Sequence, residues 1–283
     1  MQILKLDGLC KQYPAFRLEN VSFSMEAGTI MGLIGRNGAG KTTTLKSMLH
    51  LVHPDAGTVT ICGLDMDKDE REIRSRIGFV SGGASYYQRK RLRELTDVTK
   101  RFYPGWDDGR YARLVRQFSL DESKRVCELS EGMKVKYQLA AAMSHRAELL
   151  ILDEPTSGLD PVSRDELLDT FRTLCEQEGV SILFSTHITS DLDACADTIT
   201  YIQHGRVAAS TDKRAWTGAY LLLQGSDAAC TPALRAACIG ARIHKGELEA
   251  LLRKEDAALA AGFALAPANL EQIMVHLERE AEA

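Results

Sequence analysis

The chain has 283 residues, of which 45% are hydrophobic, and its formal net charge is −4. This length allows one large core and a smaller appendage, while the charge balance lacks the basic bias of nucleic-acid-binding proteins, so no nucleic-acid partner is expected. No apolar stretch approaches the roughly 20 residues that a bilayer-spanning helix needs, so work at a membrane would require a second polypeptide for the membrane part.

The order of predicted elements indicates an α/β protein. Residues 1–7 alternate in polarity like a strand and lack the profile of a signal peptide, and short strand-like segments continue to about Ile61. The elements predicted after them are a helix over 68–76, a strand over 77–80 and mostly helical sequence over 92–147. Buried strands follow over 149–152 and 181–185, with a helix opening at 160–161 between them. A strand over 219–224 and a helix over 269–280 complete the predicted order. Apolar strands separated by a helix are typical of a parallel sheet, and a shift to Ala-rich sequence places a soft boundary near Thr211.

Residues 35–42 fit the phosphate-loop pattern GxxxxGK[ST]. They lie between an apolar run of strand length, 29–34, and apolar residues at helical spacing, 43–49. Glycines let backbone N–H groups converge on phosphates, and a helix start favours negative charge. Lys41 would reach the outer phosphates and Thr42 would ligate Mg²⁺. The pattern predicts that the chain binds a nucleoside triphosphate; the alternative is a Gly-rich turn that happens to contain Lys-Thr.

Two adjacent carboxylates end the predicted strand over 149–152. Acidic residues at the carboxyl end of a strand face the ligand crevice of an open α/β sheet. We expect Asp153 to hold Mg²⁺ and Glu154 to act as the general base that polarises the attacking water. The alternative is a solvated acidic turn before Pro155.

The segment 129–133 precedes a helical stretch, 134–144. The Ser130 hydroxyl and the nearby N–H groups form a candidate second anion site at the helix start, although taken alone Ser130 is an ordinary N-cap. With residues 35–42, 149–154, 157–160 and 185–187, this segment gives five motifs whose order and spacing resemble those of the ATP-binding cassette (ABC) ATPase family. The resemblance covers about residues 3–209.

That resemblance implies a P-loop NTPase fold of ABC type, with a RecA-like α/β core, an antiparallel β subdomain and a helical signature subdomain. The nucleotide-binding domain would span residues 1–210, with the helical subdomain at about 90–147. A small C-terminal α+β accessory domain would span 211–283. In the family two such domains clasp two ATP molecules between the phosphate loop of one subunit and the signature segment of the other, so a homodimer or heterodimer is implied.

The family roles transfer to matching positions of this chain. Tyr13 is implied to stack on adenine, Glu154 to be the catalytic carboxylate and His187 to contact the γ-phosphate, with Lys41 completing the catalytic set. The residues implied to hold the phosphates are Gly35, Arg36, Asn37, Gly38, Ala39, Gly40, Lys41, Thr42 and Thr43. The remaining implied roles are Mg²⁺ ligation by Thr42 and Asp153, contact with the partner subunit's ATP by Ser130 and Gly132, and a place at the dimer seam for Asp160.

Three of these residues have plainer interpretations. Asp160 before Pro161 is a good N-cap followed by Pro at the first helical position, and it can serve as a cap and at a seam together. Tyr13 could be an exposed aromatic residue beside Pro14. His187 could be a surface histidine.

Two segments depart from the family pattern. The usual signature is LSGGQ, but here Glu131 and Met133 replace a glycine and the glutamine, leaving Ser130 and Gly132. The glutamine that usually follows the strand at 77–80 aligns with Gly82, which cannot ligate a metal through a side chain. Metal sensing and coupling at Gly82 are therefore in doubt.

The leading functional hypothesis is an ATP-hydrolysing subunit of a bacterial ABC transporter that powers a separately encoded membrane permease. Segments 103–107, 129–133 and 270–274 are similar to single-domain subunits of exporter-type systems. Seven cysteines without CxxC spacing predict reduced thiols, which favours a cytoplasmic protein. The transporter hypothesis adds a peripheral place at the inner face of the membrane, through the permease. The alternatives are a soluble ABC mechanoenzyme and a regulatory ATP-binding module with little turnover.

Overall fold

The computed structural model describes residues 1–81 and 87–282. Contacts divide the chain into two compact units, Met1–Ser210 and Thr211–Ala283. We call them unit 1 and unit 2 and describe each by itself. Gly82 lies outside the described residues, so nothing tests the interpretation of that position.

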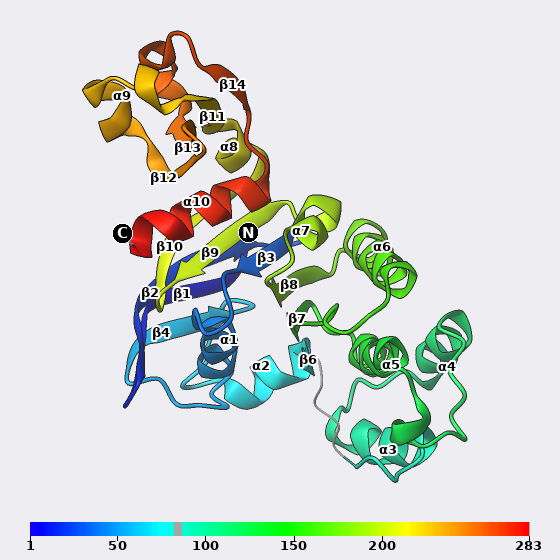
Figure 1. The fold of residues 1–283 in the computed structure, drawn as a ribbon. Helices are drawn as coiled ribbons and strands as arrows, with labels where there is room; N and C mark the ends of the chain where they lie inside the picture. Colours follow the sequence, from blue (N-terminus) through cyan, green and yellow to red (C-terminus); the bar gives the residue numbers. More distant parts are fainter. Residues whose placement is uncertain (82–86, 283) are drawn as a thin grey trace. The chain divides into compact units, whose positions relative to one another are not determined.

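Unit 1 contains two sheets (Figure 1). The antiparallel sheet has the order β2-β1-β4-β5, and the six-stranded sheet has the order β10-β9-β3-β8-β7-β6. Their strands are β1 (Gln2–Tyr13), β2 (Phe16–Glu26), β3 (Ile30–Ile34), β4 (Ala56–Ile61), β5 (Leu64–Asp65), β6 (Ile77–Ser81), β7 (Leu149–Asp153), β8 (Ser181–Thr186), β9 (Thr198–Gln203) and β10 (Arg206–Asp212). Strands β9, β3, β8, β7 and β6 pair in parallel, as the continuous apolar sequences of β7 and β8 predict for that pair.

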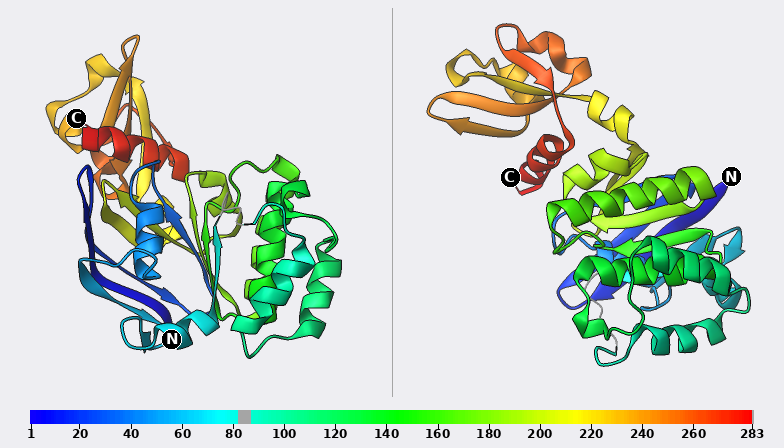
Figure 2. Two further views of the ribbon diagram at one scale, coloured as in Figure 1. Left: turned by 90° about the horizontal axis from the view of Figure 1, so that it is seen from below. Right: turned by 90° about the vertical axis from the view of Figure 1, so that its right-hand side faces the viewer.

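The helices of unit 1 connect and cover these sheets. They are α1 (Lys41–Met48), α2 (Glu70–Arg76), α3 (Leu92–Thr99), α4 (Asp108–Gln117), α5 (Glu131–Ser144), α6 (Pro161–Glu178) and α7 (Thr189–Cys195). Short 3₁₀ turns lie at η1 (Lys100–Phe102) and η2 (Val126–Glu128). Helices α3, α4 and α5 gather together beyond β6, at one end of the six-stranded sheet (Figures 1 and 2).

The main core of unit 1 lies where α1 contacts β1 and β2 of the antiparallel sheet and β7 of the parallel sheet. Its fully buried side chains include Leu6 from the antiparallel sheet, Leu45 from α1, and Leu33 and Ile151 from the six-stranded sheet. Strand β3 is buried at every residue. The core therefore fixes the carboxyl ends of β3 and β7, where the phosphate loop and the two carboxylates begin.

Unit 2 is an antiparallel sheet of order β12-β13-β11-β14. Its elements are α8 (Lys213–Gly218), β11 (Tyr220–Ser226), η3 (Asp227–Ala229), α9 (Pro232–Ala237), β12 (Ile239–His244), β13 (Glu247–Arg253), η4 (Lys254–Ala260), β14 (Ala264–Pro267) and α10 (Leu270–Glu282). Helix α10 contacts β12 and β13, while Leu223, Leu234 and Leu252 are among the side chains of a separate small core.

The predicted helices and strands are present with changes in length, but the sequence did not predict strands β9, β10, β12, β13 and β14 or helices α7, α8 and α9. The first two strands are not short: β1 has 12 residues and β2 has 11, because they pair with each other over almost their whole length. Helix α5 starts at Glu131 rather than at 134, since Ser130 caps it and the charged first turn is helical. Helix α2 starts at Glu70 rather than at 68, because residues 65–69 form a hydrogen-bonded turn.

Candidate functional site

The phosphate loop follows β3 and leads into α1, and its glycines are required by its backbone. Gly38 and Gly40 have φ angles of 85° and 114°, in the region that L side chains rarely adopt. A Cβ on Gly40 would also lie 2.7 Å from Leu18 Cδ2 and 2.8 Å from Phe16 Cζ. The loop therefore needs glycine at residue 40 for both conformational and steric reasons, and its backbone approaches the antiparallel sheet closely.

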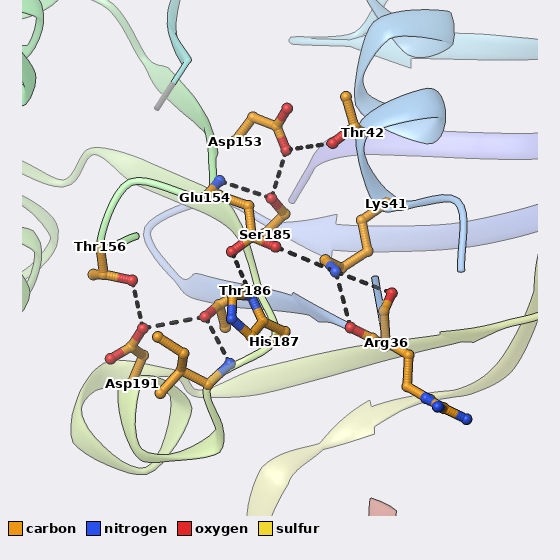
Figure 3. Close-up of polar contacts among 12 residues, drawn as sticks. Arg36, Lys41, Thr42, Asp153, Glu154, Thr156, Ser185, Thr186, His187 and Asp191 are labelled. Atoms are coloured by element: carbon orange, nitrogen blue, oxygen red, sulfur yellow. Dashed lines mark hydrogen bonds and ion pairs between the residues drawn. The ribbon is translucent and has the colours of Figure 1, made fainter. Parts of the chain in front are cut away.

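Lys41 carries a buried positive charge at the start of α1. Its side chain is 5% exposed, and its Nζ donates to the carbonyl oxygens of Gly35 at 2.8 Å and Arg36 at 3.3 Å. The same Nζ lies 3.2 Å from Glu154 Oε1 (Figure 3). A buried ammonium group is tolerated only when it is paired and hydrogen-bonded, and these three oxygens meet that requirement.

Thr42 and Asp153 bring oxygen atoms together next to Lys41. The hydroxyl of Thr42 donates to Asp153 Oδ1 at 3.0 Å, and the hydroxyl of Ser185 donates to the same oxygen at 2.7 Å. Asp153 and Ser185 are direct neighbours in the register of β7 and β8. The parallel pairing of β7 with β8 thus places the Ser185 hydroxyl on the Asp153 carboxylate, and α1 adds the hydroxyl of Thr42.

Glu154 is the first residue after β7, and its backbone is in the left-handed region with φ of 50°. Such a conformation is uncommon for a residue with a side chain, and it occurs often at functional sites. The Glu154 N–H donates to Ser185 Oγ at 2.9 Å, and Glu154 Oε2 lies 2.8 Å from His187 Nδ1. The carboxylate is therefore held between the Lys41 ammonium and the His187 ring (Figure 3).

A second set of polar residues lies directly behind this pair, and the sequence did not single it out. Asp191 Oδ2 accepts from Thr156 Oγ1 at 2.6 Å and from Thr186 Oγ1 at 3.1 Å. Ser185 and Thr186 belong to a recognised motif but had no assigned role. A signal was present: hydroxyl residues end the otherwise apolar strand β8, where a polar group must find a partner.

The other candidate residues lie apart from this cluster. Tyr13 is the last residue of β1 and is half-buried, with Lys11 Nζ 5.9 Å from its ring centroid. Ser130 is exposed, and its Oγ accepts from Met133 N at 3.2 Å. In the described part of the chain, neither side chain forms a hydrogen bond or ion pair with Lys41, Asp153 or Glu154.

Asp160 is exposed and caps α6. Its Oδ1 accepts from the N–H groups of Val162 at 3.0 Å and Ser163 at 3.1 Å. Hydrogen bonds from Ser163 hold the pKa of Asp160 below its usual value. The predicted capping is therefore present, and it does not by itself test a place at a dimer seam.

The remaining candidates of the loop are arranged around Lys41. Arg36, Asn37 and Gly38 are exposed at the tip, whereas Gly35 and Ala39 are buried. Arg36 directs its guanidinium group away from Glu154 and His187 (Figure 3). Thr43 is half-buried on α1.

Among residues 1–81 and 87–282, no helix combines the length and apolar composition needed to span a membrane.

Comparisons with known proteins agree with this geometry. A family model described as ABC transporter matches residues 18–157. The Nod factor export ATP-binding protein I of Burkholderia lata is 37% identical over 194 residues, 67% of this chain and 64% of that protein. The bacitracin transport ATP-binding protein BcrA of Enterococcus faecalis is 32% identical over 208 residues, 72% of this chain and 68% of that protein. The chain thus spans slightly less than two thirds of the Burkholderia relative.

A solved structure described as the ATP-binding subunit of an ABC transporter is 30% identical and superposes with a TM-score of 0.67. The match covers 76% of this chain and 93% of that one. The predicted fold class, a P-loop NTPase of ABC type, is confirmed. Together with the two relatives, this match shows that the chain belongs to the ATP-binding proteins of the ABC transporter family.

Proposed function

We propose that the chain binds ATP and hydrolyses it to drive a membrane permease. The observation that carries the proposal is the Glu154–His187 contact of 2.8 Å beside the buried ammonium group of Lys41. Phosphoryl transfer to water requires three groups: a carboxylate that takes a proton from the water, a ring that orients this carboxylate, and a cation that neutralises the phosphate charge.

Phosphate binding requires Lys41 to change partners. In the structure its Nζ has Glu154 at 3.2 Å as a counter-ion. A bound triphosphate would carry more negative charge than the Glu154 carboxylate, so Lys41 would turn to the phosphate and release Glu154. Nucleotide binding would in this way free the carboxylate for the attacking water.

The oxygen atoms of Thr42 and Asp153 fit a magnesium ion. Mg²⁺ prefers oxygen ligands and is usually held by one or two carboxylates together with substrate phosphates and water. In the part of the chain that the structure describes, no group of three His, Cys, Asp or Glu side chains could hold a metal alone. When bound, the ion would neutralise charge on the transferred phosphoryl group.

Hydrolysis then depends on Glu154 and His187. Glu154 would accept the proton of the attacking water, while His187 Nδ1, at 2.8 Å, would hold the carboxylate in place. His187 is 41% exposed and Glu154 is 21% exposed, so the pair is open to a water molecule.

A second ATPase subunit, identical or different, would complete the site. Ser130 and Gly132 lie at the amino end of α5, where N–H groups favour an anion. An added Cβ at Gly132 would meet Leu159 Cδ2 at 3.5 Å, an ordinary contact, so packing within the chain does not require glycine there. A close approach of the partner's nucleotide would explain the small residue.

The names of the relatives support coupling to transport. One is called a Nod factor export protein and another a bacitracin transport protein. We propose that this chain acts likewise at the inner face of a membrane, attached through its permease, and that it belongs to an exporter-type system. Residues 211–283 would form an accessory domain for regulation or docking.

The decisive test is ATP turnover by the purified chain, alone and with a co-purified permease. Turnover that the permease stimulates supports the proposal. If no membrane protein ever co-purifies, the transport function fails. Salt-sensitive nucleic-acid binding would favour a soluble mechanoenzyme, and ATP binding without turnover would favour a regulatory module.

A further inference from the structure

Asp191 is a fully buried carboxylate to which the proposed chemistry gives no role. Its side chain has 0% exposure, on helix α7. Both of its oxygens are used: Oδ2 accepts from the hydroxyls of Thr156 and Thr186, and Oδ1 accepts from Arg164 Nε. One side chain therefore joins the turn after β7, the end of β8 and the first turns of α6.

Two of the three partners flank the residues of the reacting pair. Thr156 follows Glu154 by two positions, and Thr186 immediately precedes His187. The hydroxyl of Thr186 also accepts from Ile188 N at 3.0 Å, so its proton is directed to Asp191. The backbone on both sides of His187 is thus tied to this carboxylate.

The third partner extends the link to α6. Arg164 lies one turn after Asp160, the N-cap of that helix, and its backbone N–H donates to Asp160 O at 3.0 Å. Its Nη2 donates to Ser190 Oγ at 2.7 Å, next to Asp191. The amino end of α6 and the loop that carries His187 are consequently fastened together.

We infer that Asp191 is a positioning residue that sets the spacing of Glu154 and His187. Glu154 has φ of 50°, a conformation that persists only where its surroundings over-determine it. Ser185 holds its N–H on one side, and the Thr156–Asp191 bond holds the following chain on the other. This inference rests on the proposed hydrolysis, in which a small displacement of a catalytic group lowers the rate strongly.

The main test is Asp191→Asn, which keeps the shape but replaces one acceptor with a donor. The amide cannot accept from the two threonines and from Arg164 together. We expect kcat for ATP to fall about 10- to 100-fold, while the Kd of Mg-ATP changes less than about twofold because Lys41 and the loop are untouched. If the role of Asp191 were merely structural, the substitution would lower the stability of the chain without lowering kcat at a nearly unchanged Kd.

A second measurement does not depend on turnover. The ring-nitrogen NMR signals of His187 in nucleotide-free protein report its contact with Glu154, and Glu154→Ala defines the signals when the contact is absent. We expect the signals of Asp191→Asn to move toward those of Glu154→Ala. The matched control is Asp197→Asn, since in the described part of the chain the Asp197 carboxylate accepts from Ile30 N, away from the pair; it should change neither kcat nor the His187 signals.

If Asp191→Asn does not fold, Thr186→Val removes the bond to Asp191, and with it the bond from Ile188 N, while keeping the side-chain shape. It should lower kcat in the same direction and shift the His187 signals. Unchanged kcat and unchanged His187 signals in a folded variant overturn the inference. If the unmodified chain does not hydrolyse ATP, the proposed function fails, and the His187 signals alone then decide whether Asp191 positions the pair.

Discussion

Two regions of unit 1, the phosphate loop and the signature segment, differ in how many of their candidate side chains contact one another within the single chain. On the phosphate-loop side, Lys41, Thr42, Asp153, Glu154 and His187 are joined by contacts of 2.8 to 3.2 Å. On the signature side, among residues 1–81 and 87–282, the Ser130 hydroxyl accepts one hydrogen bond, from Met133 N of its own helix. The side chains of the phosphate-loop side thus meet within one chain, whereas Ser130 caps its own helix, and its service to a partner subunit stays a prediction.

The largest effect should follow from Glu154→Gln. Losing the general base should lower turnover by roughly 10²- to 10⁴-fold while ATP still binds, because the amide cannot take a proton from water. Measurements of turnover and of nucleotide affinity separate the loss of hydrolysis from any loss of ATP binding. Light scattering with and without Mg-ATP should show that Glu154→Gln, trapped with ATP, forms a dimer.

Glu166→Gln is the matched control, since Glu166 is 58% exposed and contacts Lys136 rather than the loop. Near-normal turnover in Glu154→Gln would contradict the assigned role. A monomer with ATP would mean that the other half-site comes from a different subunit or that closure needs the permease.

Lys41→Ala should weaken the binding of Mg-ATP to the phosphate loop. Hydrogen bonds to charged groups are worth about 1.5–3 kcal/mol, so the affinity for Mg-ATP should fall roughly 10- to 100-fold. Lys46→Ala on the same helix is the control, because Lys46 is exposed and lies in the last turn. Equal affinities of the two variants, measured by calorimetry, would show that the loop does not bind the phosphates through Lys41.

Ser130→Ala tests whether the signature side serves a partner. The lost cap should destabilise the chain by about 1 kcal/mol, and turnover should fall as well. When Ser130→Ala and Lys41→Ala subunits are mixed, each heterodimer regains one site with both residues intact. Recovered turnover supports sites shared between subunits; no recovery above the separate variants would mean that Ser130 and Lys41 act together within one subunit.

The smallest effect concerns acid stability near the end of α5. His145 follows that helix, is 6% exposed, and stacks on Tyr103 with ring centroids 3.8 Å apart. Burial lowers the pKa of His145. A folded-state pKa below the unfolded value of about 6.5 gives stability that is present above that pH and is lost as the pH falls through the lowered value.

The free energy of unfolding should therefore decrease more steeply below about pH 6.5 in the natural chain than in His145→Phe, which keeps the stacking. Denaturant unfolding at pH 7.5 and pH 5 measures the difference. Parallel slopes in the two proteins would show that His145 does not titrate on unfolding.

Much of the fold was predictable because its signals are local. Apolar runs predicted β7 and β8, and Asp160 with Pro161 predicted the start of α6. The 12-residue length of β1 was missed because strand length depends on pairing with β2, which sequence alternation alone does not show. The assigned roles of the site residues stay predictions until the variants above are measured.

Sequence alone determined that a strand, a Gly-rich loop and a helix follow in order and that two carboxylates end a buried strand, because glycine spacing and apolar runs are local properties. Only the tertiary structure decided that His187 meets Glu154 at 2.8 Å and that Asp191 holds Thr156 and Thr186. These residues lie on separate loops, on helix α7 and at the end of strand β8. Their contacts arise because parallel pairing of β7 with β8 brings the carboxyl ends of both strands to one edge of the sheet.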